Sequence, residues 1–365
     1  MTHLPVHNYE RLGGLKDAPL VLVGNSLQPR RGDMSFPFVQ EANFLYITGI
    51  SEPDWAAIYT PARRYLVMPE RTEIERIFDG GLSAAEAIKI SGCDEVLSAK
   101  EGAKLLKELG IELPHSSEVV EEYRVAFARA RAIKQPHEIE ALREAIRVTN
   151  EAFEDVKRRL PEFSHEYEIE AEFNRAFRAT GLQGHAYDPI VASGKNACTL
   201  HYCQNNDALP KNGTVLIDVG AQASYFNADI TRTYAIGSPS TREREIHKAV
   251  EKAQKDIIAL IRPGVKLREY GEQADEIMKQ ALRSVNLYDK ADDFRKYFPH
   301  AVSHGLGIDV HESLGGYTEF APGMVLTVEP GIYVPEEGIG VRIEDDVLVT
   351  TDGNEVLSAS LATAL

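Results

Sequence analysis

The strongest structural signal in this chain is VLIDVGAQASYFNADITRTY, residues 215–234, which reads as two short strands joined by a tight connection. A reversal between Ala223 and Ser224 would place Asp218 directly opposite Asp229 on one face of this first hairpin. Side chains that face each other in this way have Cβ atoms about 4.5–5.5 Å apart. Two negative charges at about 5 Å repel by on the order of 3 kcal/mol at an effective dielectric near 20. We therefore expect a cation between the two carboxylates.

A second hairpin of the same kind is predicted in LTVEPGIYVPEEGIGVRIEDDVLV, residues 326–349. Its PEEG segment, residues 335–338, has the composition of a tight turn and would place Glu329 opposite Glu344. Between the two hairpins lies His304, flanked by small residues that let a ligand come close. Each of these residues alone would more often have a structural role. Together, four carboxylates and one imidazole suit two divalent ions of the Mn, Co, Fe or Zn kind better than Ca or Mg.

The composition indicates a globular enzyme of about two domains, since 365 residues exceed one ordinary core. Lys and Arg number 40 against 56 Asp and Glu, a net charge of -16, so nucleic acid is not expected as a partner. No apolar run approaches the 18 residues of a membrane span, and no secretory signal is visible, so no membrane partner is expected. The three cysteines are typical of reduced thiols, and we expect a cytoplasmic protein.

Two of these cysteines suggest an alternative catalytic chemistry. Cys198 and Cys203 bracket His201, an arrangement in which a thiol nucleophile has to be considered. The simpler interpretation is that both thiols are small hydrophobic groups beside a site.

Two domains are expected, covering residues 1–125 and 126–365. The first is predicted to be a mixed α/β domain, with strands at residues 20–23, 43–48, 56–60 and 65–68, helices at 84–91 and 99–109, and a polar loop at 32–40 that reaches toward a neighbour. In the second, helices should begin at residues 136, 166, 240 and 267, with strands at 187–193 and 199–203 before the first hairpin. The fold class is α+β, with a curved antiparallel sheet and helices on its outer face.

The contexts of the five candidate ligands carry a specific resemblance. In order, LIDVGA, ADITRT, SHGLGIDVHE, TVEPGIY and VRIEDD resemble the pita-bread metallopeptidases over about residues 131–357. Within that family, RRGDMSFPFVQEANFLYITGISEPD resembles the first domain of aminopeptidase P and of prolidases, which methionine aminopeptidases lack. The resemblance implies an aminopeptidase P-type domain followed by a pita-bread catalytic domain. Because family members are usually dimers or tetramers, it also implies a homodimer or homotetramer.

The resemblance implies a role for each ligand. Asp229 and Glu344 would bridge two metal ions, with Mn(II) favoured over Co, Zn or Fe. Asp218 would bind one of these ions, and His304 and Glu329 would bind the other. Glu329 also matches the residue that accepts a proton from the attacking water, because a carboxylate can bind a metal through one oxygen and accept a proton on the other.

Five further residues match family positions around the substrate. His201 and His311 match two substrate-side histidines, whose neutral imidazoles can donate to an oxyanion or relay a proton. Arg342 lies on the same strand face as the last ligand and can orient the carboxylates or contact the substrate. Tyr187 and Tyr333 match residues that line the pocket, although an aromatic residue beside a sheet is more often part of the core.

Two segments depart from the aminopeptidase P pattern. His311 reaches Pro322 through only ESLGGYTEFA, without the longer, arginine-bearing insert, and the connection from Glu329 to Arg342 is a minimal hairpin. A prolidase should supply a fixed positive group for the dipeptide carboxylate, and no arginine lies in residues 312–321. We therefore favour an Xaa-Pro aminopeptidase that acts on peptides with proline at the second position. The alternatives are a prolidase limited to dipeptides and an inactive binding protein of the same fold, which the presence of all five ligands disfavours.

Overall fold

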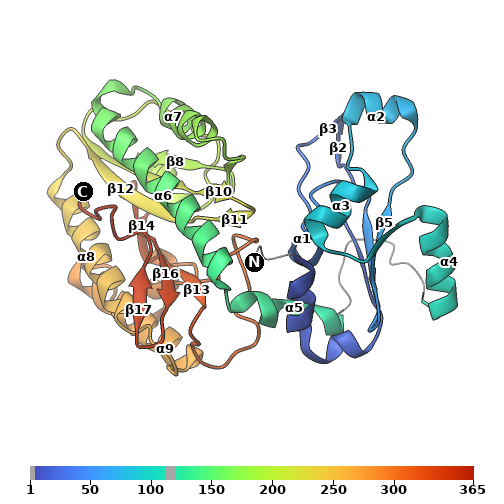
Figure 1. Cartoon of the computed structure of the whole chain (residues 1–365). Helices are drawn as coiled ribbons and strands as arrows, with labels where there is room; N and C mark the ends of the chain where they lie inside the picture. The colour runs from blue at the N-terminus through green and yellow to red at the C-terminus, as the bar shows by residue number, and fades with distance from the viewer. Residues whose placement is uncertain (1–4, 112–120) are drawn as a thin grey trace. The chain divides into compact units, whose positions relative to one another are not determined.

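The computed structural model describes residues 5–111 and 121–365, which fall into two compact units (Figure 1). Unit 1 comprises Met1–Ala130 and unit 2 comprises Arg131–Leu365. The boundary proposed at residues 125/126 lies within helix α5 (Glu121–Ala132) and stays a prediction. None of the described helices is long and apolar enough to cross a membrane.

Unit 1 contains a four-stranded sheet in the order β1-β4-β5-β6, antiparallel except for the last pair. Its strands are β1 (Leu20–Val23), β4 (Ala56–Tyr59), β5 (Arg64–Met68) and β6 (Glu95–Ser98), and a separate hairpin joins β2 (Pro29–Arg31) to β3 (Met34–Ser35). The helices of this unit are the 3-10 helix η1 (Pro5–Asp17), α1 (Ala42–Thr48), α2 (Glu73–Asp79), α3 (Ala84–Ser91) and α4 (Ala99–Leu109). The predicted mixed α/β composition of this half is confirmed.

One predicted strand of unit 1 is wrong, because residues 43–48 belong to helix α1. The carboxylate of Glu41 accepts a hydrogen bond from Phe44 N at 2.6 Å and caps the helix, and Gly49 ends it with a positive φ of 66°. Most side chains of α1 are buried, so its apolar run has no polar face to reveal a helical period.

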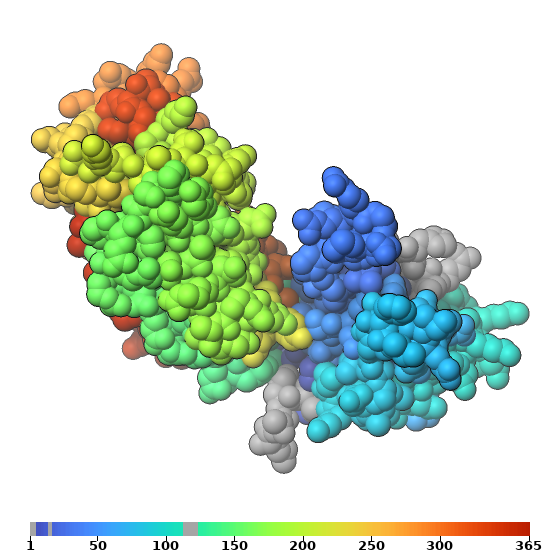
Figure 2. Space-filling model, turned by 90° about the horizontal axis from the view of Figure 1, so that it is seen from above, coloured from blue at the N-terminus to red at the C-terminus, as the bar shows by residue number. Residues whose placement is uncertain are grey.

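Unit 2 consists of antiparallel sheets with helices packed against them (Figure 1), so the predicted α+β class is confirmed. The first half contains β7 (Gly184–His185), β8 (Ile190–Ser193), β9 (Gly213–Val219), β10 (Ala221–Ala223), β11 (Phe226–Asn227) and β12 (Ile230–Ile236). Helices α6 (Pro136–Arg159) and α7 (Glu166–Ala179) share one hydrophobic core with β8, β9, β10 and β12. In Figure 2 the stretch that includes α6 and α7, coloured green, forms a large part of the face of this unit toward the viewer.

The second half repeats this arrangement of helices and strands. Its strands are β13 (Val325–Val328), β14 (Gly331–Val334), β15 (Ile339–Arg342), β16 (Asp345–Val349) and β17 (Asn354–Val356). Helices α8 (Thr241–Ile258), α9 (Leu267–Ser284) and α10 (Ala291–Tyr297) contribute to a second core with these strands. The helix predicted to begin at residue 240 is confirmed as α8, where Ser240 and Glu243 form a capping box.

The register of the first hairpin differs from the prediction by two residues. Asp218 pairs with Thr231 and not with Asp229. The turn lies at Ser224 and Tyr225, whose φ values of 47° and 69° are unusual for residues other than glycine, so the local sequence does not point to this turn. Asp229 is two residues from Thr231 and therefore a diagonal neighbour of Asp218 on the same face.

The register of the second hairpin is the predicted one. Gly331 pairs with Arg342 in β14 and β15, and Val328 pairs with Asp345 in β13 and β16. Glu329 lies between β13 and β14, and Glu344 lies between β15 and β16. Because the strand pairs on both sides have the same register, Glu329 lies opposite Glu344.

The two hairpins meet edge to edge. Glu344 N donates to Thr231 O at 3.0 Å, and the hydroxyl of Thr233 donates to Arg342 O at 3.0 Å. These contacts bring the ends of both carboxylate-bearing hairpins to one place.

The strand predicted at residues 199–203 is wrong. After β8 the chain forms the 3-10 helix η3 (Gly194–Cys198) and then an irregular segment. The side chain of Asn205 returns to β8 and accepts a hydrogen bond from Val191 N at 2.9 Å, a backbone group that another strand could have used.

Candidate metal centre

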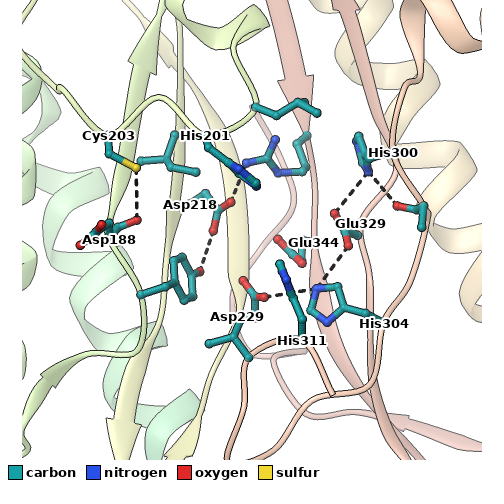
Figure 3. A pocket seen from close by; sticks show the side chains of 16 residues that line it. Asp188, His201, Cys203, Asp218, Asp229, His300, His304, His311, Glu329 and Glu344 are labelled. Atoms are coloured by element: carbon teal, nitrogen blue, oxygen red, sulfur yellow. Dashed lines mark hydrogen bonds and ion pairs between the residues drawn. The ribbon is translucent and has the colours of Figure 1, made fainter. Parts of the chain in front are cut away.

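A cavity of about 760 Å³ in unit 2 collects most of the predicted site residues (Figure 3). Nine of the ten line it: Tyr187, His201, Asp218, Asp229, His304, His311, Glu329, Arg342 and Glu344. The tenth, Tyr333, is only 2% exposed and lies behind the cavity wall, where Arg342 Nη1 donates to its hydroxyl at 2.9 Å.

The acidic and imidazole groups form three overlapping sets, in each of which one ligand atom per residue lies within 4.8 Å of the others. The sets are Asp218, Asp229 and Glu344; His304, Glu329 and Glu344; and Asp229, His304 and His311. His304 Nε2 lies 3.4 Å from Glu329 Oε1 and 3.5 Å from Asp229 Oδ2. Residues from both hairpins and from the connection between them therefore converge on one small volume.

The negative charges of these carboxylates repel one another. Burial, and then the neighbouring Asp218, raise the pKa of Asp229 well above its usual range. Burial and Asp229 do the same to the pKa of Glu344, and burial raises the pKa of Glu329 to about 8. Buried acids of this kind stay ionised only beside positive charge. The donor set therefore fits divalent cations.

Asp218 is held by donors on both of its oxygens. Arg342 Nη2 donates to Oδ2 at 2.5 Å, and the hydroxyl of Tyr187 donates to Oδ1 at 2.6 Å. Arg342 Nε also donates to the hydroxyl of Thr231 at 3.1 Å, which in turn donates to Glu344 at 2.6 Å. Through these contacts Arg342 orients acids from both hairpins.

His304 has a fixed orientation. Its Nδ1 lies 3.0 Å from Gly305 O, so this nitrogen carries the proton, and Nε2 is left to face the carboxylates. Burial lowers the pKa of His304 to about 4, so the ring is neutral at pH 7 and can act as a ligand.

His201 and His311 are exposed residues that border the same cavity. The rings of His304 and His311 meet edge to face, with centroids 4.3 Å apart. Figure 3 shows His201 and His311 beside the carboxylates.

Sequence reasoning missed His300, which also lines the cavity. Its Nδ1 lies 3.4 Å from Glu329 Oε2, and its Nε2 lies 2.9 Å from the hydroxyl of Tyr333. Burial lowers the pKa of His300 to about 4. The sequence offered one signal for a site role of this residue, because His300 stands only four residues before the candidate ligand His304.

The thiol alternative does not fit the geometry. Cys203 lines the cavity, with its Sγ 3.9 Å from Asp188 O, and Cys198 Sγ lies 3.3 Å from Ile339 O. Burial raises the pKa of both thiols, that of Cys198 to about 11. A nucleophilic cysteine needs the opposite shift, toward thiolate.

Comparisons with known proteins agree with this chemistry. Residues 140–351 match the model of metallopeptidase family M24, and residues 9–115 match that of the aminopeptidase P N-terminal domain. The chain is 31% identical to Xaa-Pro aminopeptidase 3 of Homo sapiens, over 94% of this chain and 78% of the relative. It is also 31% identical to the Xaa-Pro aminopeptidase of Haemophilus influenzae, over 94% of this chain and 91% of the relative.

A solved structure shares the fold. Zn-substituted Escherichia coli aminopeptidase P in complex with product superposes with a TM-score of 0.86 at 27% identity, covering 98% of this chain and 94% of that one. The predicted pita-bread fold behind an aminopeptidase P-type domain is thereby confirmed.

Proposed function

This chain belongs to metallopeptidase family M24, and on that basis we propose that it is a dinuclear Xaa-Pro aminopeptidase. Family membership already makes it a metallo-exopeptidase. The observation that carries the finer proposal is the cluster of four carboxylates and His304, all buried or partly buried, in a cavity large enough for a short peptide.

The ligand sets support an assignment of five residues to two ions. Asp229 and Glu344 belong both to the set that contains Asp218 and to a set that contains His304, as residues shared by two ions should. Asp218 would hold one ion, and His304 and Glu329 the other. Mixed imidazole and carboxylate donors suit Mn, Co, Fe or Zn, and among these we propose Mn(II). When bound, such ions would supply the Lewis acidity that activates water and stabilises developing negative charge.

The protein's own groups can handle the protons. Glu329 Oε1 faces His304, while Oε2 lies 3.4 Å from His300 Nδ1, so one oxygen can hold an ion and the other a proton. An ionised carboxylate can accept a proton on the oxygen that does not hold an ion. In our proposal Glu329 is the general base.

His201 and His311 would act on the substrate. The N–H groups of imidazoles beside the carboxylates can donate to the carbonyl oxygen as it gains charge, or to the nitrogen as it leaves. A proline nitrogen carries no hydrogen in the peptide, so the site does not have to provide an acceptor for it.

A prolidase with the same centre is the alternative. Residues 312–321 contain no arginine or lysine that could fix a dipeptide carboxylate, and this favours longer substrates. The test is a comparison of one Xaa-Pro-Yaa tripeptide, the matching Xaa-Pro dipeptide and an Xaa-Ala peptide with the Mn(II)-loaded protein. We expect kcat/KM to fall in that order, activity to be lost to a chelator, and Mn(II) to restore it. Cleavage of the dipeptide alone would favour the prolidase, and cleavage of none would contradict the proposal.

A cytoplasmic location and a homodimer or homotetramer stay predictions. Cell fractionation and light scattering of the purified chain would test them separately.

A further inference from the structure

The loop that carries His311 is closed by a residue outside the proposed ligand set. Gly305 N donates to Glu312 O at 3.1 Å, and Glu312 N donates to Gly305 O at 2.8 Å. This two-bond closure leaves His304 immediately before the loop and His311 at its end. Any shift of Glu312 would therefore move both histidine backbones.

The carboxylate of Glu312 turns back into the loop that it closes. Its side chain is 4% exposed, and Oε1 accepts a hydrogen bond from Ile308 N at 3.0 Å. It also occupies the space beside Gly307, where an added Cβ would lie within 2.6 Å of both carboxylate oxygens. The conformation of the loop thus depends on a carboxylate at 312 and on a glycine at 307.

Two buried cations from a distant segment hold this carboxylate in place. Arg131 Nη2 lies 2.6 Å from Oε1 and Lys134 Nζ lies 2.7 Å from Oε2, with 8% and 2% of the two side chains exposed. Arg131 Nη2 also pairs with Asp309 at 2.6 Å, and Lys134 N donates to Gly323 O. Removal of one partner from a buried ion pair leaves an uncompensated charge, which is strongly unfavourable.

The loop is also tied to the first hairpin. Asn227 N donates to Gly307 O at 3.0 Å, and the side-chain amide of Asn227 donates to Ile308 O at 2.7 Å. Asn227 is two residues before Asp229, so the loop is held at a set distance from a proposed bridging ligand.

We propose that Glu312 is a positioning residue, which sets the places of His304 and His311 relative to the carboxylates by anchoring their loop to Arg131 and Lys134. It neither lines the cavity nor belongs to any of the three ligand sets, and it acts through the two histidines. The functional consequence rests on the metal centre proposed above.

The test compares Glu312→Gln with wild type in the full-length chain. Glutamine keeps the size and an acceptor oxygen but cannot neutralise two cations. We expect Mn(II) affinity and kcat to fall about 10- to 100-fold, the range for residues that orient metal ligands, with faster amide hydrogen exchange in residues 305–312. The matched control is Glu355→Gln, since Glu355 makes two hydrogen bonds with Arg143 but both side chains are 44% exposed. This control should match wild type.

A double variant separates positioning from stability. Lys134→Met added to Glu312→Gln removes an unpaired buried cation, so the melting temperature should rise while Mn(II) affinity stays low. Recovery of affinity together with stability, or a Glu312→Gln variant that loses stability alone, would overturn the proposal. If Glu312→Gln does not fold, Lys134→Met alone provides the comparison: weaker Mn(II) binding than Glu355→Gln supports the proposal, and equal binding overturns it.

The outcome can be distinguished from failure of the proposed function. Mn(II) affinity and hydrogen exchange are measured without substrate. A wild-type chain that binds Mn(II) but cleaves no Xaa-Pro peptide would contradict the aminopeptidase assignment alone. If the wild type bound no Mn(II), the exchange of residues 305–312 in Glu312→Gln would still decide the anchoring role.

Discussion

Arg342 and Asp218 form a 2.5 Å ion pair between β15 and β9, with only 5% and 11% of their side chains exposed. The pair joins the two hairpins through side chains, next to the hydrogen bonds between the Thr233 hydroxyl of β12 and the backbone of Arg342 in β15. It also provides a fixed positive charge within the proposed metal centre, where burial raises the pKa of several acids.

Arg342→Lys should keep the charge but lose the directed contacts to Asp218, Thr231 and Tyr333, because an ammonium group lacks the guanidinium fork. We expect kcat/KM on an Xaa-Pro peptide to fall about 10- to 100-fold, as for other residues that orient metal ligands. Steady-state kinetics with the Mn(II)-loaded protein would measure this. The control is Arg242→Lys, which alters a partly exposed pair with Glu337. Equal kinetics in the two variants would argue against an orienting role.

Asp229→Asn should lose both activity and bound metal while the fold survives. A neutral amide cannot replace a carboxylate shared by two ions, and removal of one charge relieves the repulsion that raises the pKa of Glu344. Elemental analysis after dialysis should give close to two ions per wild-type chain and fewer for the variant. Asp292→Asn, an exposed position on α10, is the control. Full metal content in Asp229→Asn would rule out the bridging assignment.

His201→Ala should retain its metals but lose rate, since His201 lines the cavity without belonging to any of the three ligand sets. Loss of one hydrogen bond to the transition state typically costs about 100- to 1000-fold in kcat. Metal content and kcat measured on the same preparation would separate the two effects. Turnover at the wild-type rate would leave His201 with a structural role.

His185 should make the free energy of unfolding depend on pH. Neither ring nitrogen has a hydrogen-bond partner among the described residues, the ring packs edge to face on Phe177, and burial lowers the pKa of His185 to about 4. Between about pH 6.5, the usual value in an unfolded chain, and pH 4, the unfolded state therefore binds more protons than the folded state. Stability should fall as the pH drops through this window and be unaffected above it.

His185→Leu tests this, because leucine needs no hydrogen-bond partner. At pH 7 the variant should be more stable by about 1–3 kcal/mol, the cost of a buried unpaired polar group. Urea unfolding of the variant and the wild type at pH 7 and pH 5 would measure both the gain in stability and the dependence of stability on pH. A variant with the pH dependence of wild type would show that other groups cause it.

Local signals explain which elements could be predicted. Ser240 and Glu243 are three residues apart and cap each other, so the start of α8 follows from a short stretch of sequence. The second hairpin was predicted in the correct register because PEEG allows a tight turn at one place. The first hairpin was predicted two residues out of register because Ser224 and Tyr225 adopt positive φ without a glycine to signal it.

The sequence by itself determined the chemistry of this protein: the five candidate ligands, the α+β class and the family resemblance depend on residue types and order along the chain. Only the tertiary structure decided how these groups are held. His300 contacts Tyr333, 33 residues away, and Glu312 is anchored by Arg131, 181 residues away. Such contacts form when segments far apart in the sequence are buried together. Local propensity and residue spacing therefore do not predict which buried charged groups become partners.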